Sequence, residues 1–202
     1  MLEASRRLVA LGLNRGASGN VSARVEGGFL VTPSAMAPED MNEEDMVRMD
    51  FSGKVVSGDR PSSEWRFHRD ILACRLDVGA VIHTHSPFAT TLACLRREVP
   101  AFHYMIAAAG GTTLRCAPYA LFGTQELSDH ALAALEERRA CLLANHGMIA
   151  TGKDIDTALA LAVEVESLCE MYWRTLQVGE PHLLSDSEMT EVIEKFRGYW
   201  RR

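Results

Sequence analysis

Apolar and polar residues follow two different periods along the chain, and the changes between these periods divide it into short elements. Helical spacing predicts helices over residues 3–14, from the capping serines Ser62 and Ser63 to Leu76, and over 88–96, 127–137 and 155–178. Short apolar or alternating runs predict strands over residues 21–24, 28–32, 78–85, 112–117 and 141–144.

The order of these elements indicates an α/β fold. Several neighbouring strands are joined by short turns, so we expect a mixed or mostly antiparallel central sheet flanked by helices rather than a doubly wound parallel sheet. No repeat, low-complexity tract or long polar linker interrupts the pattern. Residues 1–202 are therefore expected to form a single domain.

The composition is that of a globular protein, with 47% hydrophobic and 24% charged residues among 202. Lysine and arginine number 21 against 27 aspartate and glutamate residues, a net charge of −6. This balance argues against nucleic-acid or anionic-membrane partners, so an anionic substrate would need a local site. A chain of this length does not need metal merely to fold, so any metal ligands are expected to be functional.

The chain is expected to work in the cytoplasm. Its first 13 residues hold only a short apolar patch after Arg6 and Arg7, too short for a signal peptide or a membrane span. Five cysteines without a CxxC pair are interpreted as reduced thiols of the core. They are Cys74, Cys94, Cys116, Cys141 and Cys169.

Three histidines are candidate metal ligands. His83 and His85 are two positions apart at the end of a predicted strand, which places both rings on one face. Two surface histidines would show the same spacing, but His146 adds a third where a buried strand breaks into a turn. Three histidines leave a zinc ion one open position, which is typical of catalytic rather than structural sites. The other histidines, His68, His130 and His182, are expected to be structural or exposed.

Polar residues at a helix start are the next candidates. Glu64 follows two serines there, and it is either a metal ligand and acid/base group or a charge that favours the helix dipole. Ser62 and Ser63 could bind phosphate at that helix end, as could the turns around Asn20 and Ser34, although the residues alone favour ordinary turn chemistry. Tyr104 precedes an alanine and glycine stretch and is either a site phenol or a buried aromatic side chain.

Taken together, these segments resemble the class II aldolase/adducin family over nearly the whole chain. The pieces that carry the resemblance are Gly12-Leu13-Asn14, Gly19-Asn20-Val21-Ser22, Thr32-Pro33, residues 61–68, His83-Thr84-His85, residues 103–111, residues 117–120, Phe122-Gly123-Thr124, Asn145-His146-Gly147 and Glu194-Lys195-Phe196.

The resemblance implies a zinc ion on His83, His85 and His146, with Glu64 as fourth ligand and as acid/base group. It also implies that a sugar phosphate binds through its phosphate group to Asn20, Ser34, Ala35, Ser62 and Ser63, where Ala35 stands in place of the family's usual glycine. Tyr104 and Tyr199 would enter from a neighbouring subunit of a homotetramer, Tyr104 as the group that protonates the developing alkoxide.

The implied activity is reversible cleavage of L-fuculose 1-phosphate, or a close ketose 1-phosphate, to dihydroxyacetone phosphate and L-lactaldehyde. Three alternatives exist on the same scaffold. Sugar-phosphate 4-epimerases resemble the chain but carry aspartate at the place of Glu64, and methylthioribulose-phosphate dehydratases lack the continuation Trp65-Arg66-Phe67. A non-enzymatic adducin-like interaction module would not need the complete ligand set found here.

Overall fold

A computed structural model describes the backbone of residues 1–199 and the side chains of residues 1–196. Within this part of the chain, eight strands form one sheet in the order β4-β3-β2-β1-β5-β8-β7-β6, in which only β6 and β7 pair in parallel. The strands are β1 (Asn20–Val25), β2 (Gly28–Val31), β3 (Val47–Asp50), β4 (Val55–Ser57), β5 (Ala80–Thr84), β6 (Cys116–Ala117), β7 (Ala140–Leu143) and β8 (Gly147–Gly152). The α/β class with a mostly antiparallel sheet is therefore confirmed.

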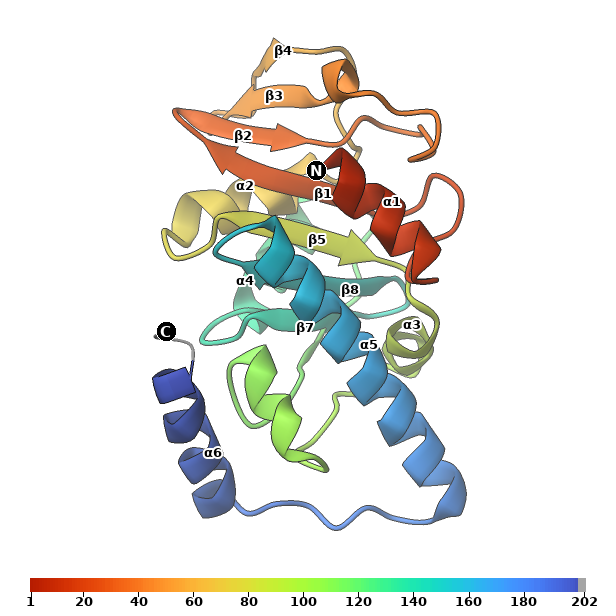
Figure 1. Ribbon diagram of the computed structural model, residues 1–202, viewed down its shortest axis with the longest axis vertical. Helices are drawn as coiled ribbons and strands as arrows, with labels where there is room; N and C mark the ends of the chain where they lie inside the picture. Colours follow the sequence, from red (N-terminus) through yellow and green to blue (C-terminus); the bar gives the residue numbers. More distant parts are fainter. Residues whose placement is uncertain (200–202) are drawn as a thin grey trace.

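Helices cover both faces of the sheet (Figure 1). They are α1 (Leu2–Ala10), α2 (Trp65–Cys74), α3 (Pro87–Cys94), α4 (Gln125–Ala134), α5 (Ile155–Val178) and α6 (Asp186–Tyr199), with short 3-10 helices η1 (Glu43–Asp45) and η2 (Tyr104–Ala109). On one face α1, α3 and α5 bury one apolar cluster, and on the other face α2 and α4 bury a second. Burial of these two clusters is the main contribution that holds the helices on the sheet.

The strand register brings the site residues to one end of the central strands. Asn20, the first residue of β1, lies opposite His83 of β5, and His83 in turn lies opposite Ile149 of β8. Opposed residues of antiparallel strands point to the same face. The ends of three strands that are far apart in the sequence thus meet beside the N-terminus of α2.

Most predicted elements are present, with shorter bounds. The helix predicted over 155–178 matches α5, whereas the strand predicted over 112–117 is reduced to β6. Helix α2 begins at Trp65, and its N-cap is Glu64 rather than a serine. The serines precede the helix, where the Ser62 hydroxyl accepts from the Glu64 backbone N–H at 3.3 Å.

Besides the two short 3-10 helices, four elements of the described residues are absent from the sequence prediction: β3, β4, β8 and α6. Every residue of β8 is buried because helices cover both faces of the central sheet, so the strand lacks the alternation that marks a half-exposed one. Strands β3 and β4 have only four and three residues, too few to establish a period.

The prediction that the cysteines are core thiols is wrong for part of the set. Cys141 and Cys169 are buried and Cys116 is half-buried, whereas Cys74 and Cys94 are exposed. The two exposed thiols end helices α2 and α3, where an apolar sequence neighbourhood does not by itself imply burial. Among the described residues, none of the helices has the length and apolar character needed to span a membrane.

Candidate active site

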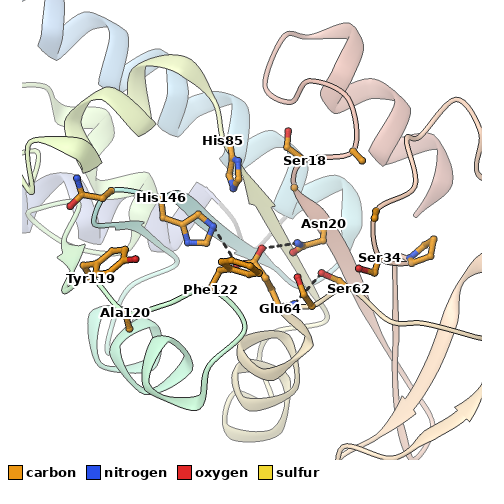
Figure 2. A pocket seen from close by; sticks show the side chains of 16 residues that line it. Ser18, Asn20, Ser34, Ser62, Glu64, His85, Tyr119, Ala120, Phe122 and His146 are labelled. Atoms are coloured by element: carbon orange, nitrogen blue, oxygen red, sulfur yellow. Dashed lines mark hydrogen bonds and ion pairs between the residues drawn. The ribbon is translucent and has the colours of Figure 1, made fainter.

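A cleft of about 350 Å³ opens at the end of the central strands (Figure 2). Asn20, Ser34 and Ser62 lie on one side of Glu64, and Tyr119 and Ala120 lie on the other, with His85 and His146 between the two sides. Its lining residues are Ala17, Ser18, Gly19, Asn20, Pro33, Ser34, Ala35, Ser62, Ser63, Glu64, His85, Tyr119, Ala120, Phe122, Asn145 and His146.

The structure brings the three predicted histidines together. His83 is the second-last residue of β5 and is fully buried, His85 follows the strand at the cleft, and His146 lies in the turn between β7 and β8. One ring nitrogen from each lies within 4.8 Å of the others. In that turn Asn145 adopts a left-handed φ of 55° and accepts a hydrogen bond from Arg96 Nε at 2.9 Å, which fixes the residue before His146.

His83 turns an electron-pair donor toward the other two histidines. His83 Nδ1–H donates to the Met148 carbonyl at 2.9 Å, so the lone pair of its Nε2 points toward His85 Nε2, 3.0 Å away. Burial lowers the pKa of His83 to about 3 and the pKa of His146 to about 4. Burial also lowers the pKa of His85. All three imidazoles are therefore neutral at pH 7, the state in which histidine binds metal.

Glu64 completes this cluster from the N-cap position of α2. Its Oε2 lies 3.2 Å from His83 Nε2, and its Oε1 lies 3.3 Å from His146 Nε2. Oε1 is buried without a hydrogen-bond partner, which is costly for a carboxylate oxygen. Three neutral imidazoles and one unpartnered carboxylate oxygen fit a divalent cation, and nitrogen-rich sets of this kind suit zinc.

His68 is part of this site, although its sequence position gave only a structural or exposed expectation. The side chain is fully buried on α2 and contacts Asn20 Oδ1 at 2.5 Å and Ser22 Oγ at 2.7 Å. Asn20 in turn donates from Nδ2 to Glu64 Oε2 at 3.0 Å. The sequence signal that could have placed His68 at the site is its spacing of four residues from Glu64, which puts both on one helix face.

The predicted phosphate-binding residues line one wall of the cleft. The segments that carry Ser34 and Ser62 are joined by backbone hydrogen bonds from Ser34 to Arg60 and from Ser62 to Thr32, with an antiparallel bridge between Pro33 and Pro61. Ser63 and Ala35 are exposed at the same wall. Hydroxyl groups beside the N-terminus of α2 form a surface on which an anion can bind.

Two aromatic side chains of the cleft were not expected from the sequence. Tyr119 and Phe122 are 51% and 60% exposed and form an aromatic wall of the cleft, with Tyr119 on the side away from Ser34 and Ser62. Their loop is fixed to α2 because Arg66 Nη1 donates to the Gly123 carbonyl at 2.8 Å. Gly123 has a left-handed φ of 75°, and a Cβ there would lie 2.7 Å from the Ser63 carbonyl oxygen, so the close approach requires glycine.

Tyr104, the first of the two predicted tyrosines, does not join this cleft within one chain. Tyr104 lies on η2, is 50% exposed, and stacks on Phe196 of α6 at a centroid distance of 6.5 Å. It is not a lining residue of the cleft that contains Glu64. The side chain of Tyr199, at the end of α6, lies outside the described residues.

Known proteins resemble the chain over its full length. Residues 1–173 match the model of the family described as "Class II Aldolase and Adducin N-terminal domain". A relative from Rhodospirillum rubrum named 5-methylthioribulose-1-phosphate/5-deoxyribulose-1-phosphate aldolase is 56% identical, covering 98% of this chain and 90% of its own. The L-fuculose phosphate aldolase of Escherichia coli K12 is 46% identical, covering 100% and 94%.

Solved structures agree with these sequence matches. A structure of L-fuculose 1-phosphate aldolase superposes with a TM-score of 0.94 at 42% identity, covering 97% of this chain and 93% of that chain. A second, titled as a putative aldolase/epimerase/decarboxylase from Klebsiella pneumoniae, superposes with a TM-score of 0.84 at 28% identity, covering 95% of each chain. The predicted resemblance is therefore confirmed, and the chain belongs to the class II aldolase and adducin family as one of its aldolases.

Proposed function

We propose that this enzyme is a zinc-dependent aldolase that cleaves the C3–C4 bond of a ketose 1-phosphate to dihydroxyacetone phosphate and a short aldehyde. The observation that carries the proposal is the cluster of His83, His85, His146 and Glu64 beside a wall of hydroxyl groups. The 56% identical relative favours 5-deoxyribulose 1-phosphate and its 5-methylthio analogue as substrates. L-Fuculose 1-phosphate, the substrate implied by the sequence motifs, is the second candidate, supported by the 46% identical relative.

The substrate phosphate would bind at the wall of the cleft that carries Ser34, Ser62 and Ser63. Ser34, Ser62 and Ser63 offer hydroxyl donors, Asn20 offers an amide N–H, and the N-terminus of α2 adds a favourable dipole for an anion. Ala35 lies at the same wall with a left-handed φ of 57°, where the backbone can approach a ligand closely. This wall gives a chain of net charge −6 a local site for an anionic substrate.

Glu64 is placed to move the proton that cleavage requires. When the C3–C4 bond breaks, its electron pair remains on C3, which must gain a proton, while the hydroxyl at C4 loses one to become the aldehyde. A divalent ion held by the three histidines would supply a positive charge against the electron density of the dihydroxyacetone phosphate half. The buried Glu64 carboxylate, beside these histidines, would first take up a proton equivalent to the one released at the C4 hydroxyl and would then deliver it to C3.

Tyr104 is the proposed proton-transfer group at the C4 oxygen. It would protonate the developing alkoxide in the condensation direction and take that proton back in the cleavage direction. Because Tyr104 does not line the cleft of its own chain, a neighbouring copy must bring it there. We therefore propose a homotetramer with active sites between subunits, in which Tyr104 and Tyr199 of one copy serve the cleft of the next. Tyr119, on the side of the cleft away from Ser34 and Ser62, would face the aldehyde half.

The test is a coupled assay of dihydroxyacetone phosphate release from three ketose 1-phosphates, with the metal content measured on the same protein. The substrates are 5-deoxyribulose 1-phosphate, its 5-methylthio analogue and L-fuculose 1-phosphate. We expect release that a chelator abolishes and zinc restores, with the highest kcat/KM on one of the two pentulose phosphates.

The outcome that contradicts the proposal is a zinc-loaded protein that releases no dihydroxyacetone phosphate from any of the three. Epimerised sugar phosphate, or loss of water from the methylthio substrate, at a higher kcat/KM than cleavage would favour the alternative reactions of this fold. A higher kcat/KM on L-fuculose 1-phosphate than on the pentulose phosphates would reverse the proposed order of substrates.

A further inference from the structure

A continuous chain of hydrogen bonds runs from the Glu64 carboxylate into the core of the protein. Glu64 Oε2 is joined to Asn20 Nδ2 at 3.0 Å, and Asn20 Oδ1 is joined to His68 Nε2 at 2.5 Å. His68 Nδ1 is joined to Ser22 Oγ at 2.7 Å. His68 and Ser22 have no exposed surface and Asn20 is 7% exposed, so water does not replace these partners.

Each donor and acceptor in this chain follows from the one before it. An ionised carboxylate only accepts hydrogen bonds, so Asn20 must turn its amide nitrogen toward Glu64 and its carbonyl oxygen toward His68. The oxygen needs a donor, so the His68 proton must be on Nε2. His68 Nδ1 is then an acceptor, to which the Ser22 hydroxyl donates. Burial, followed by repulsion from His83 when that ring is protonated, lowers the pKa of His68 well below its usual value, so the ring is neutral and carries a single N–H.

Without the His68 proton on Nε2, the Asn20 amide would lose one of the two contacts that define its orientation. A flipped amide would place Oδ1 against Glu64 Oε2, where two acceptors repel each other. The carboxylate would then turn away from His83 and His146, from which its oxygens now lie 3.2 and 3.3 Å. Buried polar chains of this kind specify one arrangement because an unpaired member is costly.

We infer that His68 is a positioning residue for the reaction, which acts through Asn20 to fix the orientation of the Glu64 carboxylate at the histidine cluster. This inference rests on the proposed function for its kinetic consequence, but the hydrogen-bonded chain itself is independent of the substrate. Asn20 then has two roles. Its oxygen and one amide hydrogen bond to His68 and Glu64, and its second amide hydrogen is available to the substrate phosphate.

The kinetic test compares two amide replacements. In His68→Gln the amide nitrogen can take the place of Nε2 and donate to Asn20, whereas in His68→Asn the shorter side chain reaches only the place of Nδ1. We expect His68→Asn to lower kcat by about 10- to 100-fold at unchanged zinc content, the usual effect of replacing a residue that orients a metal ligand through hydrogen bonds. His68→Gln should keep most of the wild-type kcat. In an Asn20→Ala background His68→Asn should have no further effect on kcat, because the two residues act in series.

A purely structural role for His68 predicts other results. Equal losses of kcat in the two replacements, or losses from His68→Asn and Asn20→Ala that multiply in the double variant, would overturn the inference. Thermal unfolding of every variant shows whether a lost activity reflects a lost fold.

A second measurement does not depend on activity. In protein labelled with 15N-histidine, the ring nitrogen shifts of His68, assigned by their absence in His68→Gln, report which nitrogen carries the proton. We expect Nε2–H in the wild type, and a proton on Nδ1 would refute the inference whatever the activity. An Nε2–H ring in a protein without aldolase activity would refute the proposed reaction and still support the oriented Glu64 carboxylate.

Discussion

Replacement of Glu64 by glutamine should lower activity and raise the stability of the metal-free protein, because the same side chain has a role in both. Glu64 is 6% exposed, its Oε2 accepts from Asn20 Nδ2, and its Oε1 has no hydrogen-bond partner. The glutamine oxygen can keep the bond to Asn20. Its NH₂ group then occupies the place of Oε1, 3.3 Å from the His146 Nε2 atom.

The loss of activity follows from the proton that glutamine cannot carry. A general acid–base group contributes about 10² to 10⁴ in rate, which corresponds to about 2.7 to 5.5 kcal/mol of transition-state free energy. The three histidines remain, so zinc should still bind to Glu64→Gln. We therefore expect kcat to fall by that factor in a variant whose metal content is unchanged.

The gain in stability follows from a hydrogen bond that the glutamine NH₂ can make in the place of the unpartnered Oε1 atom. The amide NH₂ can donate to the neutral His146 ring, and one such bond contributes about 0.5 to 1.5 kcal/mol. For a chain of this size, about 1 kcal/mol raises the melting temperature by roughly 2 to 4 °C. Differential scanning calorimetry of the chelator-treated protein measures this change.

The matched control is Glu26→Gln, which neutralises an exposed carboxylate in the turn between β1 and β2, away from the cleft. It should change neither kcat nor the melting temperature. Retained kcat in Glu64→Gln would remove Glu64 from the proton transfer. A lower melting temperature of metal-free Glu64→Gln would show that the unpaired Oε1 atom is not a source of instability.

Three further predictions concern stability. Ala35→Gly should raise the free energy of unfolding, measured by urea titration, by about 0.5 to 1 kcal/mol. Glycine relieves the strain of the left-handed φ of 57°, at some cost in the entropy of the unfolded chain. An unchanged or lower free energy of unfolding would contradict this prediction. The free energy of unfolding of the metal-free protein should fall by about 1.4 kcal/mol per pH unit for each of His83 and His146 as the pH falls from 6.5 toward 4. Their folded pKa values, about 3 and about 4, lie below the unfolded value, so the unfolded chain binds the protons first. Equal stability at pH 7 and pH 5 would refute the shifts. Phe67→Ala should destabilise the fold by about 3 to 5 kcal/mol, because the ring is buried between α2 and the sheet and packs 5.5 Å from the His83 ring, and a loss below about 1 kcal/mol would show that the cavity collapses.

The residues of the histidine cluster could be predicted from the sequence because they depend on local patterns. His83 and His85 share a face by strand alternation, and His146 lies where an apolar run ends in a turn. Strong periodicity likewise predicted α5 with its observed bounds. The family motifs added Glu64 and the serines as site residues, for which position alone left a structural explanation open.

The tertiary structure decided which of these residues meet and what supports them. The antiparallel pairing of β1 with β5 and of β5 with β8 sets Asn20 beside His83 and brings the His146 turn to the same end, through contacts between residues more than 60 positions apart. The His68 chain and the Tyr119 and Phe122 wall depend on the docking of α2 and of the following loop, which no local period encodes. The strands β3, β4 and β8 were missed for the same reason, because short or fully buried strands take their identity from their neighbours in the sheet. The sequence by itself therefore determined the kinds of groups available for catalysis, and the long-range packing determined their arrangement.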